Sequence, residues 1–425
     1  MTHPTGCVKT LLNTQRGNNM SKRIISVGVA IALMIVTAAL TFSLTMVYSQ
    51  AKFNNRVYNI KEREQVYTKL SEIDSVIRQN YVGEIDEDNL NNSIARGYVS
   101  GIGDRYAAYY TAEEYAQYLS SNEGKMVGIG VGIKQDESGY ILVTELYENS
   151  TAAEAGILEG DLIIKVGDIT VTRDTYAQAI KAVSGEAGTT VTLTIRRDSE
   201  DLSPIDVLRK EFDVVSIKSS MLSDTVGYIR ITEFNNNTVS QFKKAINNLE
   251  ASGVKGIVFD VRNNPGGSVT SVSQILDILL PEGPIVSATY KDGKTEIVAM
   301  SDASEMTLPM AVVTNSSTAS AAELFTQALK DYNKAQSVGT KTYGKGVMQA
   351  IKRLNDGSAI NLTIAKYNPP KGINYDGVGV MPDVEVAFPQ ELETEMFELS
   401  YEEDPQLLKA FDIINTKIRE AEISK

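Results

Sequence analysis

The chain has 425 residues, 42% of them hydrophobic and 22% charged, so it is long enough for about two or three globular domains and too apolar for a disordered protein. Its formal net charge of −13 argues against a nucleic-acid-binding protein, which would need a basic surface patch. The only histidine, His3, precedes a hydrophobic span and the only cysteine is Cys7, which excludes a Ser-His-Asp triad, an internal disulfide and most zinc sites.

The N-terminus carries a candidate membrane span. Residues 24–48 are strongly apolar, and this stretch is long enough for a transmembrane helix of about 20 residues. It also exceeds the roughly 7 to 15 residues of a signal-peptide core, and no clear cleavage site follows. Four basic residues and no acidic residue precede it, which keeps residues 1–23 in the cytoplasm. We therefore predict an uncleaved, single-pass signal anchor at 24–48 in the cell membrane, with the rest of the chain extracytoplasmic; a long, cleaved signal sequence is the alternative.

A helical arm is predicted at residues 56–120. Apolar residues recur there at helical spacing, and a segment rich in glycine and tyrosine, 97–110, interrupts the pattern. Nothing in the arm has the character of a nucleophile or a metal ligand. Its simplest interpretation is a spacer or a dimerisation element.

From Val127 the sequence changes to short β-branched runs separated by glycines, a pattern typical of strands. We predict four strands and two short helices, in chain order 127–133, 140–144, helix 150–157, 161–166, helix 175–183 and 190–196. This order resembles a PDZ domain over residues 125–211, with Ala155-Gly-Ile-Leu-Glu-Gly-Asp161 as its internal signature.

By this resemblance, Gly128, Ile129, Gly130 and Val131 form the carboxylate-binding loop of the PDZ-like domain. The glycines allow successive backbone N–H groups to converge on a terminal carboxylate, while the bound peptide adds as a strand to the sheet edge. Taken alone, these glycines would also fit a bulge or turn in a strand. The resemblance implies that the domain binds the C-terminal tails of proteins.

An α/β core is predicted over residues 212–390. Apolar runs expected to be buried strands alternate with amphipathic segments expected to be crossover helices, which indicates an α/β sandwich. The expected strands are 226–231, 256–261 and 310–314, and the expected helices are 239–252, 269–280 and 321–330. A hairpin follows at 347–367, where Asp356-Gly357 supplies a tight turn. A C-terminal helical segment, 391–425, closes the chain with an acidic helix at about 404–421.

Three stretches of the core match one peptidase family in order and texture. They are Phe259-Asp-Val-Arg-Asn-Asn-Pro-Gly-Gly267, Thr318-Ala-Ser-Ala-Ala-Glu323 and Thr342-Tyr-Gly-Lys-Gly-Val-Met-Gln349. With the PDZ-like insert and the arm, the chain resembles the tail-specific, or C-terminal processing, serine peptidases over about residues 60 to 415. The resemblance implies an α/β multidomain fold with a helical arm, a homodimer, and no metal or organic cofactor.

The resemblance makes Ser320 the nucleophile. Its predicted place after a buried strand, at the start of a helix, offers unpaired N–H groups that favour a nearby anion. Ser320-Ala-Ala-Glu323 is also a capping box, in which the serine would only cap the helix.

Lys345 would be the general base and Gln349 a neutral group that orients it. An ordinary lysine has a pKa near 10.4, so burial away from a carboxylate must lower it. In an extended chain Lys345, Val347 and Gln349 share one face. The alternatives are a surface lysine and a half-exposed strand glutamine.

The Asn264-Pro-Gly-Gly267 turn follows a predicted strand, so it lies at a sheet end where loops carry function. The family resemblance gives an oxyanion-binding N–H to Gly266 and a second one to Ala321. A phosphate-binding turn is the alternative, but neither a Gly-Lys-Ser/Thr nor a Gly-x-Gly-x-x-Gly pattern occurs here.

We therefore predict a membrane-anchored serine endopeptidase that processes extracytoplasmic proteins near their C-terminus. Two other classes of protein remain open at this stage. One is an inactive PDZ adaptor that tethers C-terminal tails, and the other is a serine hydrolase of small esters or amides, which would not need the carboxylate-binding loop.

Overall fold

The computed structural model describes residues 26–57, 60–147 and 149–423. The chain divides into two compact units, one ending at Asp86 and one beginning at Glu87, and each is described by itself. The predicted cytoplasmic segment 1–23 lies outside the described residues.

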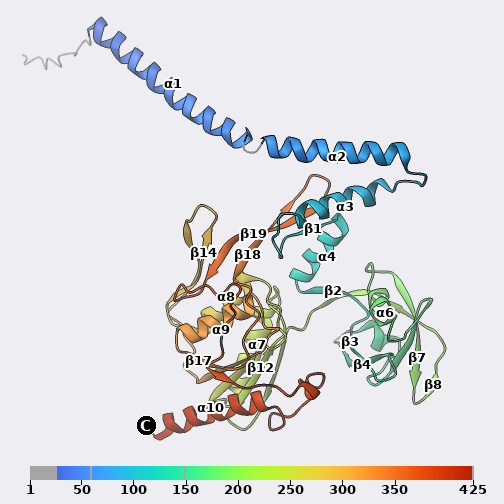
Figure 1. Cartoon of the computed structure of the whole chain (residues 1–425). Helices are drawn as coiled ribbons and strands as arrows, with labels where there is room; N and C mark the ends of the chain where they lie inside the picture. Colours follow the sequence, from blue (N-terminus) through green and yellow to red (C-terminus); the bar gives the residue numbers. More distant parts are fainter. Residues whose placement is uncertain (1–25, 58–59, 148, 424–425) are drawn as a thin grey trace, which may run out of the picture. The chain divides into compact units, whose positions relative to one another are not determined.

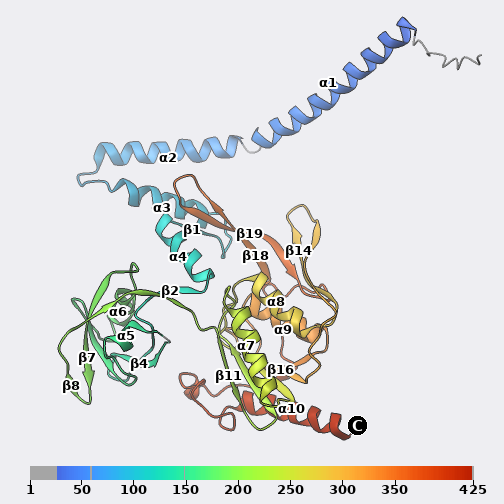
Figure 2. The same ribbon diagram turned by 180° about the vertical axis from the view of Figure 1, so that it is seen from behind.

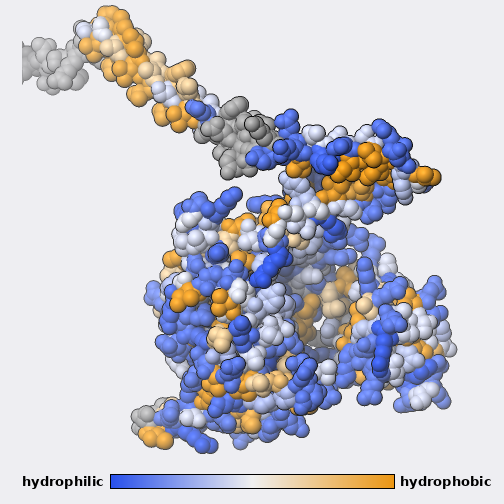
Figure 3. All heavy atoms as spheres, in the orientation of Figure 1, coloured by the Kyte–Doolittle hydropathy of each residue, from blue (hydrophilic) through white to orange (hydrophobic). Residues whose placement is uncertain are grey.

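The first unit contains two helices, α1 (Val27–Val57) and α2 (Ile60–Asn80). A stretch of 24 residues in α1, Val27–Gln50, is apolar and long enough to cross a membrane, and none of it is buried within the structure. The hydrophobic surface of α1 is visible in Figure 3. The hydroxyls of Thr37 and Thr41 donate to backbone carbonyls one turn earlier, at 2.7 and 2.8 Å, so these polar groups are satisfied inside the helix.

The second unit is built around a six-stranded sheet with the order β11-β12-β13-β16-β17-β20. Every neighbouring pair is parallel except β11 and β12. The strands are β11 (Ile217–Met221), β12 (Val226–Ile231), β13 (Gly256–Asp260), β16 (Met310–Thr314), β17 (Ala335–Gly339) and β20 (Val384–Glu385). Fully buried β13 and β16 occupy the centre, as their continuous apolar sequences predict.

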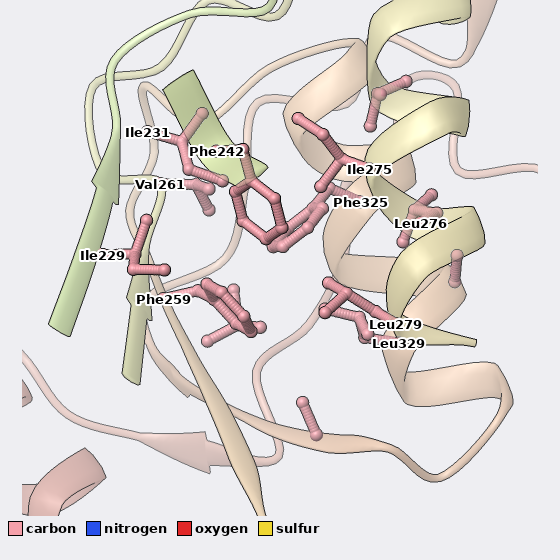
Figure 4. Close-up of a cluster of buried hydrophobic side chains, with 14 of the residues drawn as sticks. Ile229, Ile231, Phe242, Phe259, Val261, Ile275, Leu276, Leu279, Phe325 and Leu329 are labelled. Atoms are coloured by element: carbon pink, nitrogen blue, oxygen red, sulfur yellow. The ribbon is translucent and has the colours of Figure 1, made fainter. Parts of the chain in front are cut away.

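Helices cover both faces of this sheet, which gives the α/β sandwich that the sequence predicts (Figures 1 and 2). Ile257 and Phe259 face the core beneath α7 (Thr238–Ala251), α8 (Val269–Leu279) and α9 (Ala321–Asp331). Figure 4 shows Phe259, Phe242 and Phe325 packed together in this core. Val258, one residue along, packs with α10 (Pro405–Ile423) on the other face, because side chains alternate along a strand.

A second sheet joins the arm to the core. Its order is β1-β19-β14-β15, with β18 paired to β19. The strands are β1 (Ala108–Tyr110), β14 (Gly283–Tyr290), β15 (Thr295–Ser301), β18 (Val347–Arg353) and β19 (Ala359–Asn368). The predicted hairpin is β18–β19, and Gly357 in its turn has a φ of 92°. The remaining short helix is η1 (Gln390–Leu392).

Part of the predicted helical arm is a strand. Residues 87–128 form α3 (Glu87–Ser100), β1, α4 (Ala112–Asn122) and β2 (Lys125–Gly128). β1 pairs with β19 through Ala108–Asn361 and Tyr110–Ala359. The strand therefore forms because a distant segment of the chain offers a free sheet edge, and no local sequence pattern reveals this pairing. Thr111 caps α4 by a capping box with Glu114.

The PDZ-like insert enters through β2 and leaves through β10 (Lys210–Asp213), which pair with each other. Its sheet has the order β3-β4-β5-β7-β8, with β6 and β9 attached, so β3 forms an edge. The elements are β3 (Val131–Gln135), β4 (Ile141–Leu146), α5 (Thr151–Glu154), β5 (Leu162–Val166), β6 (Ile169–Thr170), α6 (Tyr176–Val183), β7 (Thr190–Arg197), β8 (Glu200–Asp201) and β9 (Ile205–Leu208). The predicted single strand 127–133 is divided at Gly130, whose φ is 75°.

Candidate active site

The candidate site forms where two neighbouring parallel strands end. β13 leads into the Asn264–Gly267 turn and β16 leads into the loop that contains Ser320, so both loops lie at the carboxyl edge of the sheet. The loops bond to each other: the Ala319 N–H donates to the Asn264 carbonyl at 2.9 Å, and the Thr318 hydroxyl donates to the Val261 carbonyl at 2.8 Å. These contacts fix the backbone on both sides of Ser320.

Ser320 occupies a strained position at the N-terminus of α9. Its φ of 55° and ψ of −117° are rare for a residue with a side chain, and such strain occurs most often at functional sites. Its backbone N–H donates to Glu323 Oε2 at 2.9 Å, which is the carboxylate half of the predicted capping box. Helix capping therefore accounts for Glu323 but gives no reason for the strained backbone at Ser320.

Lys345 lies in the loop between β17 and β18, two residues before β18 begins. Glu323 holds this loop by accepting hydrogen bonds from the N–H groups of Gly344 and Lys345, each at 2.7 Å. It also accepts the Thr342 hydroxyl at 2.5 Å. A single buried carboxylate thus connects the backbone of Ser320 to the backbone of Lys345.

The pKa of Lys345 is below its usual value. Burial is the main cause of the lowered pKa. The nearby charges of Asp104 and Glu323 raise the pKa, and the charge of Arg105 lowers it further. Throughout the described part of the chain, no carboxylate forms an ion pair with the Lys345 ammonium within 4.0 Å. This is the environment that a neutral lysine base requires.

Ser320, Lys345 and Gln349 all line one cavity of about 930 Å³. No hydrogen bond joins these three side chains to one another within the described ranges. Gln349 Nε2 instead lies 3.4 Å from the Val347 carbonyl and 3.4 Å from Thr363 Oγ1. Catalytic hydrogen bonds often tighten only when substrate is bound, so this geometry is compatible with a site awaiting its substrate.

The expectation that Lys345, Val347 and Gln349 share one face holds for Lys345 and Gln349, which line the same cavity, but not for Val347, which is buried away from it. Met348 lies opposite Ala365 and Gln349 lies opposite Thr363, so a β-bulge leaves Ile364 of β19 as the extra residue. Met348 and Gln349 both line the cavity, although they are neighbours in the chain. The bulge depends on the pairing with β19 and leaves no mark in the local sequence.

The two predicted oxyanion donors differ in their present hydrogen bonds. The Gly266 N–H donates to Asn264 Oδ1 at 2.8 Å, whereas the Ala321 N–H has no acceptor among the described residues. Gly266 has a φ of 102°, and a Cβ there would lie 2.7 Å from Ser320 Cβ and 2.8 Å from Ala321 N. Only glycine allows this turn to lie so close to Ser320.

The walls of the cavity extend beyond the predicted residues. Polar side chains of α8 lie on one side, apolar residues of β15 and β18 on another, and tyrosines of the arm on a third. These residues include Thr270, Ser273, Gln274, Val298, Met300, Met348, Tyr110, Tyr115 and Tyr118. Among residues 26–57, 60–147 and 149–423, no group of three or more His, Cys, Asp or Glu side chains could hold a metal ion.

Comparison with known proteins identifies the family of the chain. The model of peptidase family S41 matches residues 225–386, and a PDZ domain model matches residues 142–197. A CtpA-like serine protease of Staphylococcus aureus (strain MSSA476) is 32% identical over 385 residues, which are 89% of this chain and 76% of the relative. This chain belongs to peptidase family S41. It is an S41 C-terminal processing serine peptidase with a PDZ domain.

The chain is also similar to a second curated relative and to a solved structure. A CtpA-like serine protease of Staphylococcus epidermidis (strain ATCC 35984) is 33% identical over 370 residues, which are 85% of this chain and 73% of the relative. Among solved structures, the photosystem II D1 C-terminal processing protease aligns with a TM-score of 0.46 at 24% identity, covering 76% of this chain and 88% of that one.

In the PDZ domain of this S41 peptidase, the residues predicted to bind a carboxylate precede an edge strand of the sheet. Gly128, Ile129, Gly130 and Val131 are buried and lead into the edge strand β3. The Ile129 carbonyl accepts the Ala152 N–H and the Ser150 hydroxyl, each at 3.0 Å, which ties the loop to α5. A Cβ at Gly130 would lie 2.8 Å from Phe212, so this position requires glycine.

Sequence reasoning missed two contributors to the site of this peptidase. Glu323 was assigned only to a capping box, and the segment Asp104–Tyr106 was assigned to a featureless arm. The Tyr106 ring lies 4.8 Å from Lys345 Nζ. The sequence signal for Glu323 is the capping-box pattern, but no pattern marks the arm segment, because Tyr106 and Lys345 are 239 positions apart in the chain.

Proposed function

We propose that this S41 peptidase is an endopeptidase of extracytoplasmic proteins in which Ser320 is the nucleophile and Lys345 the general base. The observation that carries the proposal is that one cavity contains both a strained serine at the N-cap position of α9 and a half-buried lysine whose pKa is lowered. A serine needs an adjacent base to become nucleophilic, and a neutral amine can serve as that base.

Acylation uses the two side chains in turn. Ser320 Oγ attacks the carbonyl carbon of the scissile peptide bond, and its proton passes to neutral Lys345 Nζ. The resulting ammonium then donates that proton to the leaving amine nitrogen as the C–N bond breaks. Ser320 is left as an ester of the N-terminal product, and Lys345 is neutral again.

Deacylation repeats the proton transfers with water. Lys345 Nζ accepts a proton from water while the water oxygen attacks the ester carbonyl. The ester C–O bond breaks, the proton returns to Ser320 Oγ, and the product leaves with a new C-terminal carboxylate. Gln349, which is neutral, orients Lys345 without holding it in the charged form.

The oxyanion of each tetrahedral intermediate is bound by the N–H groups of Ala321 and Gly266. The Ala321 N–H is free to donate, whereas the Gly266 N–H must leave Asn264 Oδ1 as substrate binds. Each such donor is worth on the order of 3 kcal/mol of the activation barrier.

The PDZ domain supplies recognition of the substrate tail. The N–H groups of Ile129, Gly130 and Val131 bind the terminal carboxylate, and the tail adds as a strand to the free edge of β3. The apolar helix α1 anchors the chain in the cell membrane with residues 1–23 in the cytoplasm, so the peptidase acts outside the cytoplasm. The chain works as a homodimer.

The first test is cleavage of an unstructured protein by the full-length chain in detergent. Ser320→Ala and Lys345→Ala should abolish cleavage, whereas Ser316→Ala and Lys352→Ala, which replace exposed residues of the same types, should not. Folding of every variant is verified by circular dichroism. Cleavage that survives either of the first two substitutions would refute the dyad, and folded but inactive wild-type chain would favour a tethering role.

Tail recognition is tested separately. Amidation of the substrate C-terminus should raise KM, because the carboxylate that the PDZ loop binds is gone. An unchanged KM would remove the tail-binding part of the proposal while leaving the dyad intact.

A further inference from the structure

Three consecutive residues of the arm, Asp104, Arg105 and Tyr106, lie near Lys345 or the loop that carries it. Tyr106 places the face of its ring 4.8 Å from Lys345 Nζ, and the Arg105 guanidinium lies 4.5 Å from the centre of the same ring. Arg105 Nη2 also donates to the carbonyl of Gly344 at 3.3 Å. The residue before the lysine is therefore bonded to the arm on one side and to Glu323 on the other.

Asp104 connects the same segment to Gln349. Its Oδ2 accepts the Thr363 N–H at 3.1 Å, and the Thr363 hydroxyl lies 3.4 Å from Gln349 Nε2. Its Oδ1 accepts the Tyr106 N–H at 2.9 Å, which fixes the turn that presents the tyrosine ring. Through Thr363, this one carboxylate links the turn that carries Tyr106 to the strand facing Gln349.

The arm segment is held against the core by a strand. β1 follows it directly and pairs with β19 through Ala108–Asn361 and Tyr110–Ala359. The Asn361 side chain adds a bond from Nδ2 to the Tyr106 carbonyl at 3.3 Å. The position of the Tyr106 ring is therefore fixed by the same sheet that carries Gln349.

The charged groups around Lys345 come from three elements. Asp104 and Glu323 favour the ammonium form, while burial and Arg105 favour the neutral amine. Asp376 also faces this loop, where its Oδ1 accepts the Gly346 N–H at 3.1 Å. Asp104 and Arg105 thus act in opposite directions on one group, although they are neighbours in the chain.

We propose that Asp104, Arg105 and Tyr106 are positioning residues for the base: the Tyr106 ring shields the Lys345 amine from water, Asp104 fixes the turn that carries this ring, and Arg105 holds the backbone of Gly344 next to the lysine. The proposal rests on the proposed function of Lys345. It gives the arm a part in the reaction in addition to any role as a spacer.

The two charged residues provide a test of opposite signs. The acid limb of kcat/KM against pH reports the base of the free enzyme. Asp104→Asn removes a carboxylate that favours the ammonium, so the limb should move to lower pH. Arg105→Gln removes a cation but keeps a donor for the Gly344 carbonyl, so the limb should move to higher pH. Each shift should be on the order of one pH unit.

Tyr106 offers a matched pair of variants. Its buried hydroxyl has no hydrogen-bond partner among the described residues, so Tyr106→Phe should keep the wild-type profile. Tyr106→Ala opens the amine to water, which reduces the effect of burial, so the acid limb should move to higher pH and kcat should fall. Tyr98→Ala, which replaces an exposed tyrosine of α3, should change neither.

Labelling separates this inference from the proposed function. The full-length chain is treated with acetic anhydride across a pH series, and acetylation at Lys345 is quantified by peptide mass mapping. The inference is supported if the midpoint pH of Lys345 acetylation falls in Asp104→Asn and rises in Arg105→Gln. This holds even if Lys345→Ala still cleaves substrate, because that result would refute only the proposed role of Lys345 in catalysis. Midpoints that coincide with that of the wild-type chain, or that move in the same direction, overturn the inference.

Discussion

Two fully buried carboxylates in the catalytic core, Glu323 and Asp260, are held in opposite ways. Glu323, beside the cavity, accepts the N–H groups of Ser320, Gly344 and Lys345 and the Thr342 hydroxyl, all of which are neutral donors. Asp260, which faces α10, is paired with Arg262 at 2.6 Å, and Arg262 also pairs with Asp404 at 2.7 Å.

The difference follows from what each region must do. Glu323 accepts hydrogen bonds from backbone N–H groups of two loops, so it sets the relative positions of Ser320 and Lys345. The cluster of Asp260, Arg262 and Asp404 instead joins the end of β13 to the start of α10 through ion pairs. The buried charge of Glu323 thus positions the loops of the candidate active site, whereas the buried charge of Asp260 attaches α10 to the sheet.

The largest loss of stability is expected in the cluster of Asp260, Arg262 and Asp404. Arg262→Met leaves Asp260 and Asp404 buried without their cation and should lower the free energy of unfolding by about 3–5 kcal/mol. Urea unfolding followed by circular dichroism measures it. Arg196→Met is the control, because its partner Asp201 is exposed, and it should unfold close to the wild-type chain. If Arg262→Met lowers the free energy of unfolding by less than about 1 kcal/mol, the ion pairs of Asp260 and Asp404 do not hold α10 to the sheet, and the contrast with Glu323 is refuted.

Glu323→Gln should act mainly on activity. The amide replaces one acceptor oxygen by an NH₂ group that opposes the N–H donors of the two loops, so Ser320 and Lys345 lose their relative placement. We expect kcat/KM to fall about 100-fold, or roughly 2.7 kcal/mol, with a smaller loss of stability than in Arg262→Met. Glu250→Gln, at an exposed position of α7, is the control. Activity within about threefold of wild type would show that Glu323 only caps α9.

Much of the core could be predicted from the sequence, because β13 and β16 are continuous apolar runs and α7–α9 have regular apolar spacing. The candidate residues could also be placed, since the three motifs around Gly266, Ser320 and Lys345 each follow a predicted strand or precede one. These local signals fix where each loop begins.

What could not be predicted depends on contacts between distant segments. β1 becomes a strand only by pairing with β19, and the β-bulge opposite Met348 and Gln349 lies in β19 itself. Glu323 shows the same limit: Ser-x-x-Glu indicates a capping box, but its bonds to Gly344 and Lys345 exist only after the two loops meet.

Asp161 in the PDZ domain tests an intermediate case. Burial raises the pKa of its carboxyl, but the Arg197 guanidinium and the Leu158 N–H outweigh burial and lower the pKa below 3.8. The carboxylate therefore stabilises the fold at pH values above 3.8, and this stability is lost as pH falls through the lower folded-state pKa. Asp161→Asn should cost about 1–3 kcal/mol at neutral pH.

Urea midpoints at several pH values check this expectation. The gap between Asp161→Asn and wild type should narrow as pH falls below 3.8. A gap that is constant with pH would show that packing of the side chain, and not its charge, supports the PDZ fold.

The smallest effect is expected for an exposed pair. Lys218 and Glu145 approach to 2.8 Å, but their side chains are 52% and 42% exposed. Lys218→Ala should change the free energy of unfolding by less than about 0.5 kcal/mol, because water and salt screen such pairs. A change above about 1 kcal/mol would mean that burial is not what separates strong from weak charge pairs in this protein.

The central claim, that Lys345 activates Ser320, is tested most directly by the rate at which a fluorophosphonate phosphonylates the full-length chain, a reaction in which the serine oxygen bonds to phosphorus and fluoride leaves. We predict that mass mapping finds the adduct on Ser320. The rate of the reaction should rise with pH around a midpoint below the ordinary pKa of lysine, and Lys345→Met should lower this rate at least about 100-fold. An adduct on another serine, or an unchanged rate in Lys345→Met, would contradict the account.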